Sequence, residues 1–137
     1  MSYDFMFRAK DKASWDAFTS LKQLTKEVTY NEETYLQPVE QVYIDEIGPI
    51  VSEPAVFNAN GEISTPAVMD NGWHVNVRIV GNKLVVTTDS DGNETSSGWD
   101  FDGLATVSNS TIAWVNPENV DNPRRIFAGG MSYYIPE

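Results

Sequence analysis

Two strand-like runs around a glycine-asparagine pair constrain this chain more than any other feature of its sequence. Residues 73–80 alternate apolar and polar side chains as far as Ile79, residues 83–88 are rich in β-branched residues, and Gly81-Asn82 separates the two runs. A period of two is typical of a half-buried strand, and a two-residue loop with glycine first favours a type II′ turn. We therefore predict a hairpin with His74, Asn76 and Arg78 on its polar face. Its apolar face would carry Val75, Val77, Ile79, Leu84 and Val86.

The beginning of the chain predicts a strand followed by a helix. Tyr3, Phe5 and Phe7 alternate with polar or smaller residues, as in a strand with one aromatic face. Asp11 is then a suitable N-cap for a helix. The helix would turn one apolar stripe toward the core, made of Trp15, Phe18, Leu21 and Leu24.

The remaining segments predict shorter elements. Residues 41–47 are typical of a strand, and residues 48–70, with Asn60-Gly61 as a turn, form an edge hairpin or an ordered loop. Residues 89–103 are a loop, and residues 111–115 and 125–128 are short strands. We expect the α+β class, a small antiparallel sheet with one N-terminal amphipathic helix packed on it, plus hairpins. Residues 1–130 would form a single α+β domain and residues 131–137 a C-terminal arm.

Charge narrows the range of partners. The 137 residues include 20 acidic and nine basic side chains, for a formal charge of −11. Such a surface repels phosphate backbones and anionic lipids, so we expect neither nucleic acid nor membrane as a partner. There is no cysteine, and the first residues lack the basic start and apolar run of a signal peptide, which predicts a cytoplasmic protein.

Motifs for catalysis or cofactor binding are absent from the sequence. With His74 as the single histidine and no nucleophile elbow, serine-hydrolase chemistry is disfavoured. Residues 89–100 resemble a calcium loop but place Glu94 where the glycine must stand, so we interpret them as a turn. Carboxylate pairs such as Asp100 and Asp102 are not specific. We expect no cofactor, no metal and no catalytic residue.

Aromatic and basic side chains near the predicted loops are candidates for binding. Trp73, Trp99 and Trp114 fit burial in the core, a protein interface or a platform for sugars. Arg124 and Arg125 lie in an otherwise base-free stretch, so they would dock on a neighbouring acidic copy or pair within the fold.

Four blocks of the sequence resemble small uncharacterised proteins of tailed bacteriophages and prophages. They are residues 3–18, 44–50, 70–78 and 122–130, of which Gly-Trp-His-Val-Asn-Val-Arg followed by Asn-Pro-Arg-Arg-Ile-Phe-Ala is the most specific. The resemblance implies a product of the structural or tail gene region in the bacterial cytoplasm, with incorporation in the virion left open. It carries over no functional residue.

The sequence thus predicts a phage or prophage protein of unknown activity, a non-enzymatic minor virion or tail-assembly component that binds other phage proteins or itself as a homo-oligomer. The alternatives are a small enzyme acting on cell-wall saccharides and an acidic host-directed inhibitor. We expect the interface in seven residues: Trp73, His74, Asn76, Arg78, Trp99, Arg124 and Arg125.

Overall fold

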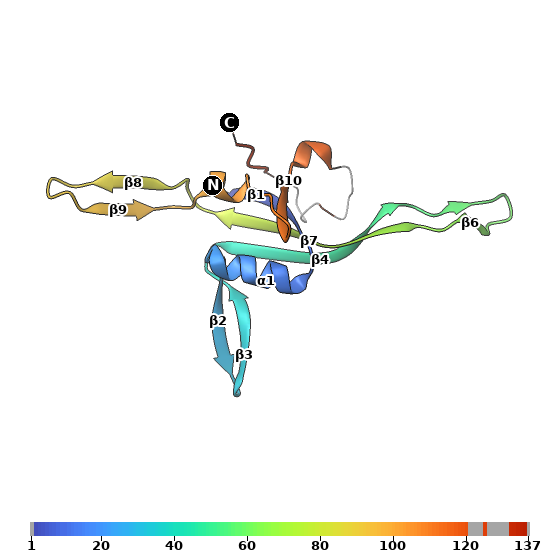
Figure 1. Cartoon of the computed structure of the whole chain (residues 1–137), viewed down its shortest axis with the longest axis horizontal. Helices are drawn as coiled ribbons and strands as arrows, with labels where there is room; N and C mark the ends of the chain where they lie inside the picture. Colours follow the sequence, from blue (N-terminus) through green and yellow to red (C-terminus); the bar gives the residue numbers. More distant parts are fainter. Residues whose placement is uncertain (1, 121–124, 126–131, 137) are drawn as a thin grey trace.

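A central four-stranded antiparallel sheet organises the molecule. The computed structural model describes residues 2–120, 125 and 132–136. The strands lie in the order β10 (Ile112–Val115), β1 (Ser2–Ala9), β7 (Val68–Val80) and β4 (Val42–Glu53). Figure 1 shows β4 and β7 running far beyond the other two strands. The long β4–β7 pair therefore belongs to the sheet at one end and leaves it at the other.

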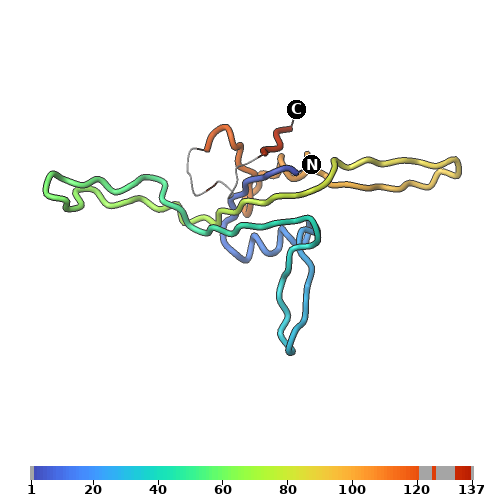
Figure 2. Tube along the Cα trace, turned by 180° about the vertical axis from the view of Figure 1, so that it is seen from behind, coloured from blue at the N-terminus to red at the C-terminus, as the bar shows by residue number. Residues whose placement is uncertain are grey.

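Three two-stranded hairpins project from this sheet. One consists of β2 (Thr25–Tyr30) and β3 (Glu33–Pro38), and another of β8 (Val85–Thr88) and β9 (Glu94–Ser97). The third continues the β4–β7 pair and ends in β5 (Val56–Phe57) and β6 (Ile63–Thr65); we call residues 49–70 the arm. The arm and the β8–β9 hairpin extend in opposite directions (Figures 1 and 2), so the molecule is elongated.

Three short helical segments lie within residues 2–120: α1 (Lys12–Leu21), α2 (Phe101–Leu104) and the 3-10 turn η1 (Pro117–Asn119). Asp11 caps α1, since its Oδ1 accepts a hydrogen bond of 2.8 Å from the Ser14 amide, which confirms the predicted N-cap. The predicted apolar stripe is only partly right. Trp15 and Phe18 are buried, whereas Leu21 is 77% exposed, because the helix ends there and the chain turns before it buries Leu24.

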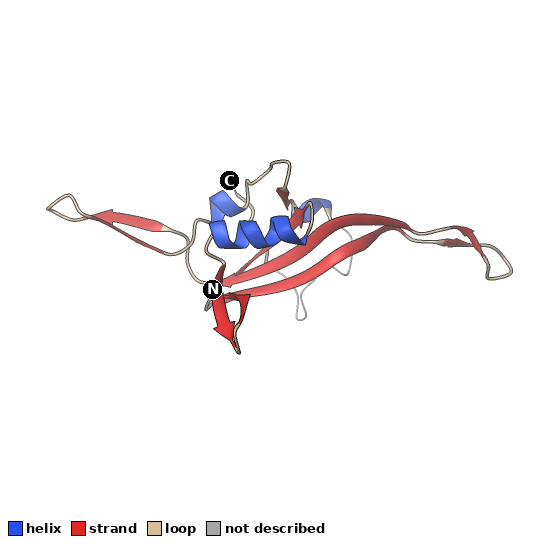
Figure 3. Ribbon diagram, turned by 60° about the horizontal axis from the view of Figure 1, so that its bottom comes forward, coloured by secondary structure: helices blue, strands red, loops and turns tan. Residues whose placement is uncertain are grey.

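The expected α+β class is wrong. Strands take up 53% of the described residues and helices 14%, in several small sheets with only one helix of seven residues or more (Figure 3). The fold is therefore mostly β, with several small sheets in place of the expected single small sheet and its helix. The additional strands arise in polar, turn-rich stretches such as residues 25–38 and 94–97, where β pairing satisfies the backbone although the side chains signal a loop.

The predicted hairpin around Gly81-Asn82 is also wrong. Its first run is β7, which pairs with β1 on one side and β4 on the other, from Ser2↔Val80 to Ala9↔Trp73 and from Val42↔Ile79 onward. A strand with two neighbours has no edge left for a third. The second run is β8, which therefore pairs with β9 instead.

Other predicted elements agree with the structure. The strands expected at residues 41–47 and 111–115 are β4 and β10. Asn60-Gly61 lies in the turn between β5 and β6, where the Gly61 amide donates to the Asn58 carbonyl at 3.0 Å. The strand expected at residues 125–128 falls, apart from Arg125, outside the described residues.

The core lies between the sheet, α1 and α2. The rings of Trp15 and Phe18 contact that of Phe7 at centroid distances of 5.8 and 5.3 Å, and Phe5 contacts Phe101 at 5.5 Å. Asp4 and Met6, on the other face of β1, are buried as well. The predicted half-buried strand is thus covered on both faces.

Candidate protein-binding surface

The polar residues of β7 share one face of the sheet, as predicted, but that face is covered. In the strand register Arg8, Met6 and Asp4 lie opposite His74, Asn76 and Arg78, respectively. His74 and Asn76 are only 4% and 0% exposed. The C-terminal segment covers Asp4, whose backbone amide donates to the Ser132 carbonyl at 2.7 Å. His74 and Asn76 consequently stabilise the fold instead of presenting a polar surface.

A polar cluster holds the base of the arm. Asp70 accepts hydrogen bonds from Arg8 Nη2 at 2.7 Å and Nε at 3.0 Å, and its Oδ2 lies 3.2 Å from His74 Nε2. The bonds from Arg8 are the main reason why the pKa of Asp70 lies well below its usual value. His74 Nδ1 is 2.9 Å from the Gly48 carbonyl. Because both ring nitrogens face acceptors, both contacts become hydrogen bonds only when the ring carries two protons.

The edge strand bends where the arm leaves the sheet. The β4–β7 register shifts between Glu46 and Gly48, and Gly48 has a φ of 79°, a left-handed conformation that favours glycine. A Cβ there would lie 3.3 Å from the Trp73 ring. Trp73 is half-buried, and its Nε1 donates to Glu46 Oε1 at 3.0 Å. Trp73 and His74 therefore fix the start of the arm.

Two arginines are held within the described structure. Arg78 Nε donates to the fully buried Asp4 Oδ1 at 2.7 Å, and this bond raises the pKa of Arg78. Arg125 is buried, donates through Nη2 to the Phe7 and Val75 carbonyls, and accepts a bond from Asn76 Nδ2 at its own carbonyl. Burial lowers the pKa of Arg125 to about 10. Arg124 lies outside the described residues.

Trp99 lies at the base of the β8–β9 hairpin. It is half-buried against the core, its amide donates to the Asn82 carbonyl at 3.0 Å, and its carbonyl accepts from the Leu84 amide. Beside it, Lys83 Nζ pairs with Asp102 at 2.9 Å, and Tyr134 donates to the same carboxylate. Chiefly through Asp102, these contacts raise the pKa of Lys83 to about 12. Trp99 thus anchors this hairpin, as Trp73 anchors the arm.

Most of the exposed large apolar side chains lie on the hairpins and the arm, where sequence reasoning did not place a site. Among the large apolar side chains of the described residues, Leu21 on α1 is the most exposed, at 77%, and Tyr43 of β4 is exposed as well. The exposed apolar residues of the hairpins and the arm are Tyr30 and Tyr35; Val51, Val56, Phe57, Ile63, Val68 and Met69; and Leu84, Val85 and Val86. The signal was present in the sequence as short apolar runs beside turn residues, but only the tertiary structure shows that nothing in the described chain covers them.

The β8–β9 and β5–β6 pairs have no other described element packed on either face. All four residues of β8 and all four of β9 are exposed, as are the two of β5 and the three of β6. An isolated two-stranded hairpin is marginally stable in water, and contiguous exposed apolar surface commonly marks a contact site. The exposed apolar residues of the three projections are therefore the candidate protein-binding surface.

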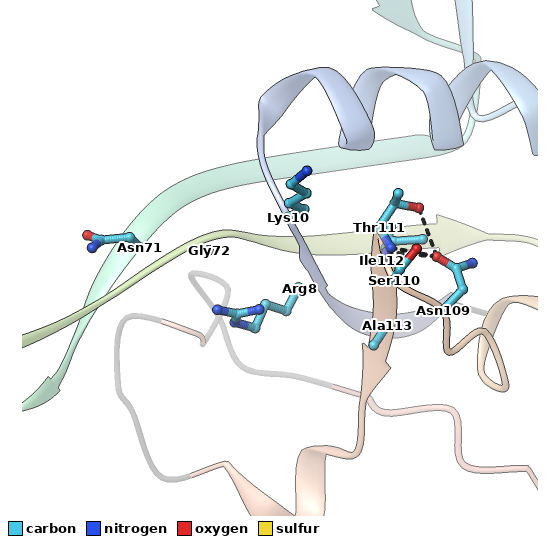
Figure 4. A pocket seen from close by; sticks show the side chains of 9 residues that line it. All are labelled: Arg8, Lys10, Asn71, Gly72, Asn109, Ser110, Thr111, Ile112 and Ala113. Atoms are coloured by element: carbon cyan, nitrogen blue, oxygen red, sulfur yellow. Dashed lines mark hydrogen bonds between the residues drawn. The ribbon is translucent and has the colours of Figure 1, made fainter.

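Three hollows formed by described residues do not offer a pair of carboxylates. One, of about 360 Å³, is lined by Arg8, Lys10 and polar or small residues (Figure 4). A second hollow, of about 420 Å³ along α1, has Asp11 as its one acidic lining residue, and a third, beside Trp99, has no acidic lining residue. Within the described residues, no three His, Asp or Glu side chains converge as a metal site would require. None of the described helices is long and apolar enough to cross a bilayer.

Comparisons with known proteins give no relative. No family model matches the sequence, and neither a curated protein nor a solved structure is significantly similar to it. The function must therefore be argued from the geometry of the chain itself.

Proposed function

We propose that this chain is a non-enzymatic assembly protein that binds other proteins, or further copies of itself, through its projecting hairpins. The observation that carries the proposal is the exposure of apolar side chains on three two-stranded projections. Val85, Val86, Phe57 and Ile63 are each more than half exposed. Removing such side chains from water would contribute about 25 cal/mol per Å², and a partner would also order hairpins that have little packing of their own.

The setting that we propose is the assembly of a bacteriophage or prophage particle, as a minor virion or tail-assembly component. This part rests on the resemblance of the sequence blocks described above. Projecting arms support it, because a subunit that reaches over its neighbours gains contact area without a large core. The polar cluster around Asp70 supports it too, since it gives the arm a fixed direction.

The alternative of a saccharide-cleaving enzyme finds less support. It requires two carboxylates that converge across a cleft, about 5 to 10 Å apart. In the loop expected to supply them, Asp89 instead accepts bonds from the Asp91 and Asn93 amides at a hairpin tip, and Asp100 caps α2 through the Gly103 amide. Asp102 is bound to Lys83 and Tyr134.

Mass spectrometry of particles and assembly intermediates from the source strain after prophage induction tests the proposal. We expect peptides of this chain at a fixed ratio to tail proteins. A Val85→Ser/Val86→Ser variant would lower that ratio, whereas the matched Glu118→Ser control, at an exposed position away from the hairpins, would not. Absence from particles and intermediates alike, with abundant folded protein in the lysate, would overturn the phage setting.

A further inference from the structure

An uncovered groove runs along α1. The hollow beside the helix is lined by Ala13, Ala17 and Leu21, which are exposed and four residues apart on one helix face. It shares Asn109, Thr111 and Ile112 with the hollow drawn in Figure 4, so the two hollows are neighbours, and the second reaches Lys10. We call the two together the helix groove. Along the helix its lining includes apolar side chains, and at the other end it includes Arg8 and Lys10, with the carboxylate of Asp11 beside Lys10.

Positive charge is concentrated in the segment of the sequence that contains α1. Five of the nine Lys and Arg residues lie between Arg8 and Lys26, and two of them, Arg8 and Lys10, line the groove, although the chain as a whole carries −11. Arg8 is paired with Asp70, and Lys12 with Asp16 and Glu46. Lys10 interacts electrostatically with the exposed Asp11 but has no ion pair within 4 Å among the described residues, so it can also meet a carboxylate from outside.

The end of the arm complements the helix groove in polarity and in charge. Phe57 lies opposite Ile63 in the β5–β6 pair, and the two side chains are 61% and 60% exposed. Glu62 adjoins them and Glu53 lies nearby on β4, while the sequence has no Lys or Arg between Lys26 and Arg78. This end therefore presents an apolar pair flanked by carboxylates without a competing cation.

The arm cannot reach the groove of its own chain. It leaves the sheet and points away from α1 (Figures 1, 2 and 3). A contact between the two surfaces must join separate copies. Because the surfaces differ, the contact is heterologous, and repetition of such a contact produces a ring or a filament.

We propose that the arm end of one copy docks in the helix groove of a second copy. The Phe57–Ile63 pair would cover Ala17 and Leu21, and Glu62 would lie near Lys10. This inference rests on the proposed function, for which it names the partner as a second copy of the chain.

Charge reversal tests the pairing of the two surfaces. By light scattering and sedimentation at low salt, wild-type protein should associate with increasing concentration, and salt should weaken that association. Glu62→Lys and Lys10→Glu should each weaken it about tenfold, and the double variant should recover most of the loss, because the two charges are exchanged and not removed. Glu118→Lys, which makes the same charge reversal at another exposed position, is the matched control and should associate as strongly as wild type.

Mixing tests the head-to-tail geometry. Phe57→Ser/Ile63→Ser removes the arm surface, and Ala17→Glu blocks the groove at an exposed helix position; each alone should be monomeric. An equal mixture should form dimers and nothing larger, since only one contact per pair remains functional. Circular dichroism should show that each variant keeps the wild-type fold, and Ala17→Gln provides a second, uncharged block of the groove.

The outcomes separate this inference from the proposed function. If wild type stays monomeric, or if the mixture does not associate, the inference is overturned. If particle incorporation nevertheless depends on the hairpins, the proposed function stands and the partner is another protein. If neither association nor incorporation depends on the hairpins, both fail.

Discussion

In β7, Val75, Val77 and Ile79 are fully buried, whereas Val85 and Val86 of β8, from an equally apolar run five residues further along, are more than half exposed. Both regions are rich in β-branched residues, which favour extended backbone. They differ in their neighbours, since β7 lies between β1 and β4 while β8 has only β9. The local sequence thus specifies a strand. The elements that surround this strand decide whether its apolar side chains stabilise the fold or remain available to a partner.

The largest expected difference concerns two phenylalanines. Phe7→Ala, in contact with Trp15 and Phe18, should lower the free energy of unfolding by about 3 to 5 kcal/mol. Phe57→Ala, at the exposed arm end, should change it by less than about 0.5 kcal/mol. Urea denaturation of monomeric protein measures both. A similar loss for both variants would mean that the arm is part of the folding core, contrary to the comparison.

An intermediate effect is expected at the junction of the two regions. The pKa of Asp70 is lower in the folded chain than its ordinary value of about 4, mainly because of Arg8. Its ionised form therefore stabilises the fold above about pH 4, and this contribution is lost as the pH falls toward the lower folded pKa. Thermal unfolding of wild type and Asp70→Asn between pH 7 and pH 2 should show a flatter acid limb in the variant. Parallel curves would exclude this role.

The smallest global effect is expected at the tip of the β8–β9 hairpin. Asp89 Oδ1 accepts bonds of 2.9 Å from the Asp91 and Asn93 amides. Asp89→Ala should leave the unfolding free energy within about 0.5 kcal/mol of wild type, because the hairpin adds little to the core. Hydrogen exchange should nevertheless become faster in β8 and β9 but not in β1 or β7. Faster exchange throughout the chain would show that the hairpin supports the sheet.

Local features could be read from the sequence where the chemistry of a few neighbouring residues decides the structure. The cap at Asp11, the turn at Asn60-Gly61 and the shared face of His74, Asn76 and Arg78 are of this kind. The candidate site was harder to predict. The predicted interface residues Trp73 and Trp99 anchor the projections, whereas the exposed residues of these projections, such as Phe57 and Val85, belong to no recognisable motif.

The sequence by itself determined that the chain forms alternating strands with one capped helix, has a strongly acidic surface and carries no recognisable catalytic motif. Only the tertiary structure decided which strands pair. It placed β7 between β1 and β4, so that Asn76 is buried beside Arg125, Arg78 pairs with Asp4, and β8 must pair elsewhere. The physical reason is that strand pairing is a long-range choice of backbone hydrogen bonds, which adjacent side chains do not encode.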